Sequence, residues 1–279
     1  MNFDFSQILW ILFLVMTIWP MMKRQSVERS RYGFLRSFEK QRNSRLITLI
    51  HRQEAISILG LPISRYIDIE DSEQVLRAIR LTPDDMPIDI VLHTPGGLVL
   101  AAEQISHALL RHPAKVTVFV PHYAMSGGTM IALAADEIVM DCNAVLGPVD
   151  PQLGQYPAVS ILKAVSQKNI NKVDDNTLIM ADMAEKAIKQ VEDFLNLLLA
   201  DKFPPEQAQA LAHTLSEGKW THDYPITCDK LKEMGLKINA DFPISLYDLM
   251  ELYPQPVQRR PSVQYIPLPY GKETFKKPL

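Results

Sequence analysis

The chain has 279 residues, of which 47% are apolar and 22% charged, with a formal net charge of −3. This composition is typical of a globular protein and excludes a disordered chain, and so small a net charge does not indicate a nucleic-acid partner. The two cysteines, Cys142 and Cys228, are far apart and lack ligand spacing, so neither a disulfide framework nor a zinc site is indicated. No histidine set has metal spacing either, and we expect no metal and no cofactor.

The first 22 residues form a candidate membrane anchor. Residues 5–22, FSQILWILFLVMTIWPMM, carry no charge and have about the length that a helix needs to cross the hydrocarbon core. Trp10 and Trp19 are typical of the membrane interface. A cleaved signal peptide normally begins with basic residues and ends at small ones, and this segment has neither. We therefore expect an uncleaved, single-pass anchor in the cell inner membrane.

The segment after the anchor is basic, and residues 23–44 are expected to form a juxtamembrane helix. Nine lysines and arginines lie between residues 23 and 52, against only Glu28 and Glu39. Positive charge marks the cytoplasmic flank of a membrane segment and attracts the anionic inner leaflet. The rest of the chain is therefore expected to face the cytoplasm.

Short apolar strands alternate with helices from residue 45 onward. The spacing predicts strands at 45–50, 87–93, 115–120 and 136–141. It predicts helices at 72–80, with Asp71 or Ser72 as the cap, at 98–112 and at 128–135. Strands that are apolar almost throughout and alternate with helices indicate a mainly parallel sheet covered on both faces, which is an α/β fold.

The last third of the chain is more helical. A long amphipathic helix is predicted at 177–203, before Pro204 and Pro205, with one apolar face that contains Met180, Met183, Ala187, Val191, Phe194 and Leu198. After a further helix and a turn at Gly218, a loop with the sequence WTHDYPIT precedes a short helix that Gly235 closes. The proline-rich tail, 254–279, is expected to be extended.

Two glycine-containing loops leave neighbouring predicted strands. HTPGGL follows the strand at 87–93 and AMSGGT follows the strand at 115–120, so both loops belong to the edge where α/β sheets bind ligands. Glycines let backbone N–H groups approach a substrate oxygen, and a helix N-terminus adds further donors, so the loops together predict an oxyanion hole. Ser126, at the start of one helix, is then a candidate nucleophile. The alternative is a serine that only caps the helix.

Four motifs, HTPGG, AMSGGTMIALAADEI, GPVDPQLG and EGKWTHDYPIT, carry a family resemblance. Together they resemble the membrane-anchored serine dehydrogenase proteinase family, which is related to signal peptide peptidase A and to the proteolytic subunit of Clp protease. The resemblance implies a Clp protease/crotonase-like fold of βαβ units and hydrolysis of peptide bonds. It also implies Ser126 as nucleophile and the N–H groups of Gly97 and Gly127 as oxyanion donors.

The general base stays open at this point. Clp protease has a histidine about 25 residues after the serine, where this chain has Asp150. The resembled family is described as using serine, aspartate and histidine in that order, which implies His222 as the base with Asp150 orienting its ring. Signal peptide peptidase A instead uses a lysine on a later helix, which implies Lys186, at the border of the apolar face. His122 is a weaker third candidate.

The sequence as a whole predicts a membrane-anchored serine endopeptidase with its catalytic domain facing the cytoplasm. We expect protein or peptide substrates and a homo-oligomer, with the long helix as a contact. The expected domains are the anchor at 1–22, the basic helix at 23–44, the protease domain at 45–253 and the tail at 254–279. The alternatives are a crotonase-type acyl-CoA enzyme, which uses the oxyanion hole without a nucleophilic serine, and an inactive membrane scaffold of the same fold.

Overall fold

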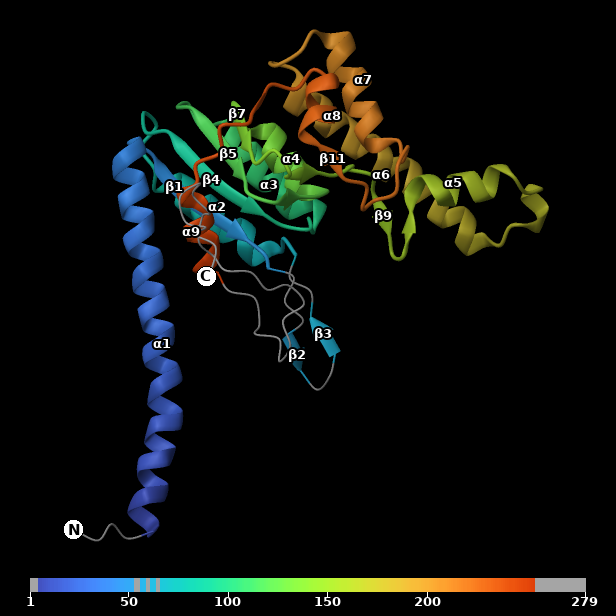
Figure 1. The fold of residues 1–279 in the computed structure, drawn as a ribbon. Helices are drawn as coiled ribbons and strands as arrows, with labels where there is room; N and C mark the ends of the chain where they lie inside the picture. The colour runs from blue at the N-terminus through green and yellow to red at the C-terminus, as the bar shows by residue number, and fades with distance from the viewer. Residues whose placement is uncertain (1–4, 53–55, 59–60, 64–65, 254–279) are drawn as a thin grey trace, which may run out of the picture.

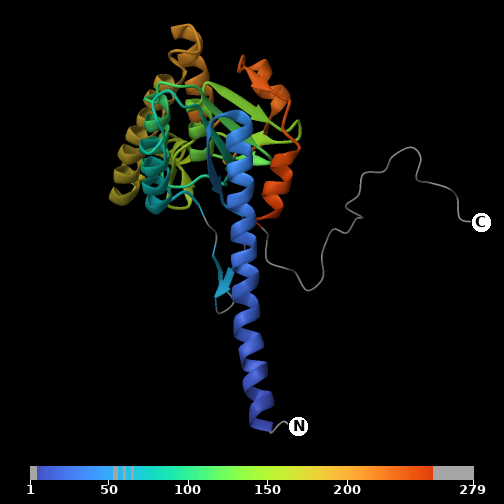
Figure 2. The ribbon, with the colours of Figure 1, turned by 90° about the vertical axis from the view of Figure 1, so that its left-hand side faces the viewer.

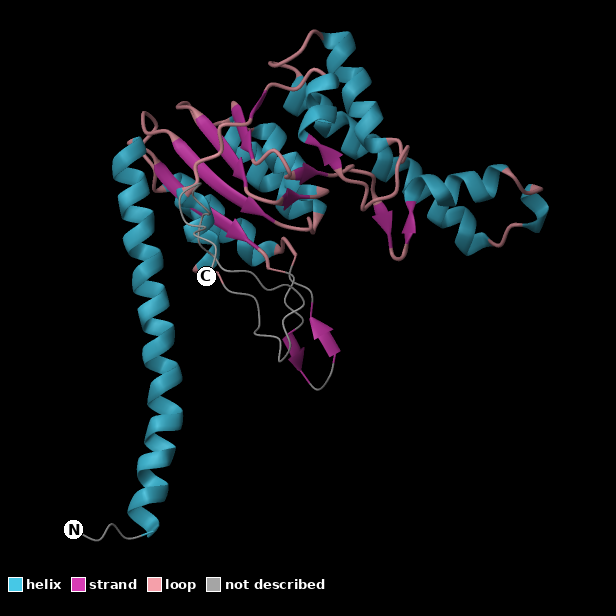
Figure 3. Cartoon of the chain, in the orientation of Figure 1, coloured by secondary structure: helices cyan, strands magenta, loops and turns pink. Residues whose placement is uncertain are grey.

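A five-stranded parallel sheet is the centre of the computed structural model, which describes residues 5–52, 56–58, 61–63 and 66–253 (Figures 1 and 3). Across the sheet, the strands run in the order β1 (Arg45–Ile50), β4 (Ile88–His93), β5 (Val116–Val120), β7 (Glu137–Met140) and β12 (Ile238–Asn239). The predicted α/β fold is confirmed, and the four predicted strands lie within one residue of their expected limits. Sequence analysis did not anticipate β12.

Strand β4 shows why these segments form a sheet with two covered faces. All six of its residues are buried, and Ile90 pairs in register with Ile47 of β1 and Val118 of β5. Ile88, Ile90 and Leu92 face the larger core, whereas Val91 belongs to a smaller core on the other face. Four of its six residues are apolar, and a strand buried on both faces is typical of a parallel sheet between two layers of helices.

Helices cover the larger core on one side of the sheet. They are α2 (Ile69–Arg80), α3 (Val99–Leu110), α4 (Gly127–Ala134), α6 (Asp175–Leu199), α7 (Pro205–Ser216) and α8 (Cys228–Glu233). Helix α2 is capped by Asp68 and not by Asp71 or Ser72, so the expected cap was wrong. Asp68 accepts the Asp71 N–H, and the Asp71 carboxylate accepts the Asp68 N–H, which completes a capping box and adds one turn to the helix.

The other face is covered by α9 (Ser245–Glu251) and by the end of α1 (Phe5–Arg42). The Phe38 ring packs edge-on against Phe119, with 6.0 Å between the ring centroids. Below them, the buried Asp89 carboxylate accepts from the Arg42 guanidinium, with Nε 2.5 Å from one oxygen and Nη2 3.1 Å from the other. These contacts fix α1 to the central strand.

Helix α1 runs without a break across the predicted boundary at residue 22 and projects far beyond the domain (Figures 1 and 2). The Trp10 and Trp19 side chains are 65% and 71% exposed. Among the residues that the structure describes, no helix combines the length and the apolar character needed to cross a membrane. The anchor therefore stays a prediction, and the tail at 254–279 lies outside the described residues.

Several short elements complete the fold. Three two-residue strands, β6 (Tyr123–Ala124), β8 (Val145–Leu146) and β11 (Ile226–Thr227), form a second sheet. Two hairpins are formed by β2 (Ile56–Ile58) with β3 (Leu61–Ile63) and by β9 (Gln152–Leu153) with β10 (Tyr156–Pro157), and α5 (Ala158–Ser166) and the 3₁₀ turn Ile170–Lys172 follow.

Helices α5 and α6 form a projection on the side of the domain away from α1 (Figure 1). Helix α5 packs on the first half of α6 and buries Ala184 together with Ala158 and Ile161. Met183, which the sequence placed on the buried face, is 50% exposed. In this part of the helix Ala184 is buried in place of Met183, while the predicted Met180 still packs against the α5 contact.

Candidate active site

Ser126 occupies a sharp turn between β6 and helix α4. The Gly128 N–H donates to the Met125 carbonyl oxygen at 2.7 Å, and Ser126 is the first central residue of this turn, with φ 50° and ψ −116°. A side chain at such φ and ψ costs free energy, which is why glycine usually occupies this position. The Ser126 hydroxyl makes no capping hydrogen bond to α4, so the serine does not serve as an ordinary helix cap.

The two glycine loops lie side by side, as their positions after neighbouring strands predicted. A Cβ atom added to Gly96, which has φ +105°, would lie 2.8 Å from the Ser126 Cβ and from the Met125 oxygen. A Cβ added to Gly127 would lie 3.7 Å from the Gly97 nitrogen. The backbone of one loop is therefore packed directly against Ser126 in the other, and only glycine fits at position 96.

Two backbone donors next to Ser126 are unpaired. Within the described parts of the chain, the N–H groups of Gly97 and Gly127 have no acceptor. The neighbours of Gly97 are paired, because the Gly96 oxygen accepts from the Ile67 N–H and the Leu98 N–H donates to the Ile67 oxygen. Unpaired N–H groups at a helix N-terminus and in a glycine loop can bind a negatively charged oxygen.

His222 and Asp150 contact each other, although 72 residues separate them in the sequence. His222 Nδ1 lies 2.8 Å from Asp150 Oδ1, and the other carboxylate oxygen accepts from Gln152 Nε2 at 2.6 Å. Asp150 is 3% exposed, whereas the His222 side chain is 35% exposed. A buried carboxylate bonded to Nδ1 holds the imidazole so that Nε2 can accept a proton.

Ser126, Asp150 and His222 each lie close in sequence to a strand of the second sheet. Ser126 follows β6 by two residues, Asp150 follows β8 by four, and His222 precedes β11 by four. Since β8 pairs with both β6 and β11, all three residues belong to the ends of one small sheet. Among the hydrogen bonds of the described residues, none joins Ser126 to His222. Such bonds often form only when substrate is bound.

The other two candidate bases have different surroundings. The Lys186 side chain is 69% exposed and pairs with Asp182 on its own helix, with 2.5 Å between Nζ and Oδ2. It is not the partly buried lysine that the sequence suggested. His122 is exposed, and its ring packs edge-on against Tyr123 and His93. Burial, with Arg52 nearby, lowers the pKa of the adjacent His93 to about 3, so that ring is neutral.

A family model described as ClpP-like SDH-type serine proteinase matches residues 1–278. The chain belongs to this family. Two uncharacterized proteins of Methanocaldococcus jannaschii are 55% and 57% identical to this chain, and the alignments cover 99% and 95% of it and 96% and 90% of theirs. The solved structure of ClpP1 from Listeria monocytogenes is also similar, with a TM-score of 0.47 and 15% identity over 75% of this chain and 98% of its own.

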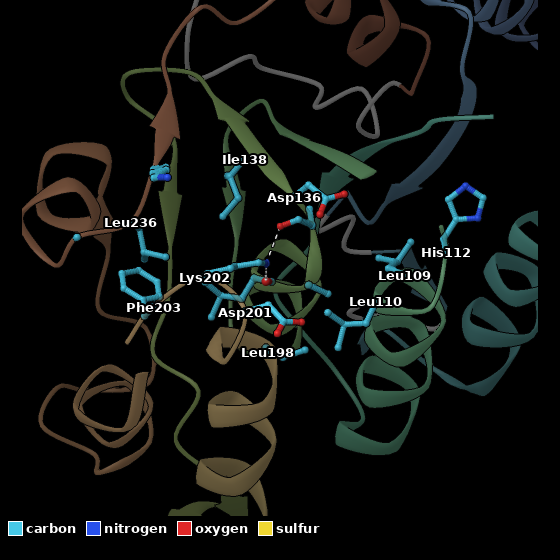
Figure 4. A pocket seen from close by; sticks show the side chains of 15 residues that line it. Leu109, Leu110, His112, Asp136, Ile138, Leu198, Asp201, Lys202, Phe203 and Leu236 are labelled. Carbon is cyan, nitrogen blue, oxygen red and sulfur yellow. Dashed lines mark hydrogen bonds between the residues drawn. The ribbon is translucent and has the colours of Figure 1, made fainter. Parts of the chain in front are cut away.

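A cavity of about 360 Å³ lies at the far end of α4, and Ser126 does not line it (Figure 4). Lys202 crosses the cavity and donates to the carbonyl oxygens of Leu133 and Ala135, the last turn of α4. Burial lowers the pKa of Lys202 to about 8, against the attraction of Asp136 and Asp201. The cavity is therefore a separate feature from the serine site.

Two polar residues that support the site were not singled out in the sequence. The buried Thr129 hydroxyl lies 2.9 Å from the oxygens of Ala124 and Gly147 and ties α4 to the loop after β8. Gln152 holds the Asp150 carboxylate. Both belong to quoted motifs, AMSGGT and GPVDPQLG, but a polar residue beside a glycine or proline does not reveal its distant partner.

Proposed function

We propose that this chain is a serine endopeptidase that cleaves peptide bonds through an acyl-enzyme on Ser126. The observation that carries the proposal is the hydrogen bond between His222 and the buried Asp150, in the small sheet that also positions Ser126. The family assignment supports the same class of reaction. A nucleophile, a base and an orienting carboxylate are the three groups that this chemistry needs.

The chemistry follows from the placement of these groups. Asp150 accepts the Nδ1 proton of His222, so Nε2 takes the proton of the Ser126 hydroxyl as its oxygen attacks the substrate carbonyl carbon. The carbonyl oxygen becomes negative and accepts from the free N–H groups of Gly97 and Gly127. His222 then returns the proton to the leaving amine as the peptide bond breaks. Water, activated by the same ring, hydrolyses the ester and regenerates Ser126.

A fluorophosphonate probe tests this proposal, because only an activated serine reacts readily with it. We expect labelling of Ser126 and casein cleavage in the wild type, and loss of both in Ser126→Ala. An acyl-CoA enzyme of the same fold, or an inactive scaffold, would remain unlabelled. Adduct mapping to another serine, or casein cleavage by Ser126→Ala, would refute the assignment.

The base is tested by two matched variants. His222→Gln is expected to lower kcat by about a thousandfold or more, whereas Lys186→Met is expected to keep kcat within about twofold. A histidine base also gives activity that rises at about pH 6 to 7, and a lysine base usually needs about pH 8 or above. If Lys186→Met were inactive and His222→Gln active, the base would be Lys186, and a serine–lysine dyad would replace the proposed triad.

We infer further that residues 5–22 anchor the protein in the inner membrane and that the protease domain faces the cytoplasm. The inference rests on the uncharged sequence, on the basic residues after it and on the exposed tryptophans of α1. A C-terminal reporter should be active in the cytoplasm, and the protein should sediment with membranes and keep its N-terminus. A soluble protein, or one that begins after residue 22, would contradict the inference.

We also propose a homo-oligomer in which the α5–α6 projection contacts a second copy. Ile170, Ile179 and Met183 expose apolar side chains there, 56%, 60% and 50% respectively. A cluster of exposed apolar residues is typical of a protein interface. Light scattering should give a mass of several chains, and Ile179→Asp with Met183→Asp should reduce it. An unchanged mass in the double variant would exclude this surface as the contact.

A further inference from the structure

We propose that His51 and Asp71 act through Thr94 as positioning residues that hold the Gly96–Gly97 loop against Ser126. This inference deepens the proposed function, since it assigns the support of the predicted oxyanion donor at Gly97. It rests on a line of hydrogen bonds that contains neither His222 nor Asp150. The line begins at the N-terminal turn of α2, passes the end of β1 and ends in the glycine loop.

The contacts form one continuous path. Asp71 Oδ2 lies 3.0 Å from His51 Nε2, and His51 Nδ1 lies 3.0 Å from the Thr94 hydroxyl oxygen. That hydroxyl oxygen accepts from the Gly96 N–H at 3.2 Å. His51 is 6% exposed and Thr94 is fully buried, so water has little access to the bond between them, whereas the Asp71 side chain is 28% exposed.

The chemistry of the groups determines which atom donates each hydrogen bond of the path. Burial raises the pKa of the Asp71 carboxyl, but the hydrogen bonds from His51 and from the Asp68 N–H outweigh it, and the pKa lies below its usual range. The carboxylate only accepts, so it takes the Nε2 proton of His51. In this tautomer Nδ1 accepts the Thr94 hydroxyl proton, for which the Gly96 oxygen at 3.3 Å is the other acceptor. In both cases the Thr94 oxygen accepts from the Gly96 N–H.

The path ends in the glycine loop, where a small movement would displace backbone atoms that pack against Ser126. Gly96 packs against Ser126 so closely that an added Cβ would lie 2.8 Å from the Ser126 Cβ. Gly97 is held just as tightly, because a Cβ there would lie 2.2 Å from the Ile67 oxygen. Ile67 directly precedes the cap of α2 and bonds the loop directly, whereas Asp71 is connected to the loop only through His51 and Thr94. If His51 only filled space in the core, it would not need hydrogen bonds to both Asp71 and Thr94.

Removing the path should reorient the Gly96 peptide and misplace the Gly97 N–H. Thr94→Val removes only the hydroxyl, and Thr94→Ser keeps it. On a peptide substrate, Thr94→Val and His51→Gln should lower kcat by about tenfold to a hundredfold with KM within about twofold. The reason is that a misplaced donor weakens binding of the transition state but not binding of the substrate. Thr94→Ser should restore kcat to within about threefold of the wild type. Inhibition by a tripeptide aldehyde ending in leucinal, which forms the tetrahedral oxyanion, should weaken by the same factor as kcat.

His112→Gln is the matched control, because His112 bonds the Met86 oxygen at the other end of the sheet and should keep kcat unchanged. Amide hydrogen exchange of residues 96–98 gives a readout that does not depend on activity, and it should accelerate in Thr94→Val and in Asp71→Asn. Unchanged kcat and unchanged exchange in these variants would overturn the positioning role. A Ser126→Ala variant that still cleaves peptides would overturn the proposed function, and the exchange measurement would still test the path.

Discussion

Replacement of Ser126 by glycine should stabilise the fold, although it removes the nucleophile. The Ser126 backbone has φ 50° and ψ −116°, and the turn is closed by the Gly128 N–H on the Met125 oxygen. A residue with a side chain in such a conformation costs on the order of 1–3 kcal/mol, and glycine adopts it without that cost. The wild-type protein therefore carries backbone strain at Ser126, the residue whose hydroxyl the proposed mechanism uses.

Ser126→Ala is the control that isolates the backbone effect. Both variants lose the hydroxyl, which makes no capping bond, so alanine should change the free energy of unfolding by less than about 0.5 kcal/mol. Glycine gains the relief of strain but loses about 0.5–1 kcal/mol through the greater entropy of the unfolded chain. The expected net gain of Ser126→Gly over Ser126→Ala is about 1 kcal/mol, or about 2–4 °C in Tm.

The assay is thermal and urea unfolding of the full-length variants at equal protein concentration. Equal concentrations matter because assembly would raise the apparent stability of both variants. Ser126→Gly should unfold at higher temperature and at higher urea than Ser126→Ala. A glycine variant that is no more stable than the alanine variant would mean that the turn carries no strain at this residue.

Three further predictions follow from side chains with unusual surroundings. Gln152→Leu should lower kcat by about tenfold, measured on a peptide substrate, because Asp150 loses its second hydrogen-bond donor; an unchanged kcat would contradict this. Between about pH 8 and 10.5 the unfolded chain carries a proton on Lys202 that the folded chain lacks, so urea unfolding should show stability rising with pH, by at most about 3 kcal/mol. Lys202→Met should remove this rise, and a rise that persists would mean another group causes it. Arg42→Met should cost about 3 kcal/mol in the same assay, because it leaves the Asp89 carboxylate buried without its partner; a loss below about 1 kcal/mol would mean that the pair is effectively exposed.

Local patterns in the sequence were enough to predict the sheet and the serine turn. β4 and β5 are almost entirely apolar, so their burial between two layers follows from composition alone. The glycine pairs that follow them could be placed at one edge of the sheet, because neighbouring parallel strands end together. The sequence therefore predicted that the two loops lie side by side, whereas the positive φ of Ser126 and the packing of Gly96 against it were found only in the structure.

Tertiary structure decided how the remaining groups meet. The strands β6, β8 and β11 have two residues each, too few to show a periodicity, and their pairing brings His222 to Asp150. The sequence left Lys186 only slightly behind His222, because the partner of a lysine at the border of a helix face depends on which element packs there. The path from Asp71 through His51 likewise crosses from α2 to the end of β1. Residue type and spacing determine which elements form, whereas contacts between distant segments depend on packing that no short stretch of sequence contains.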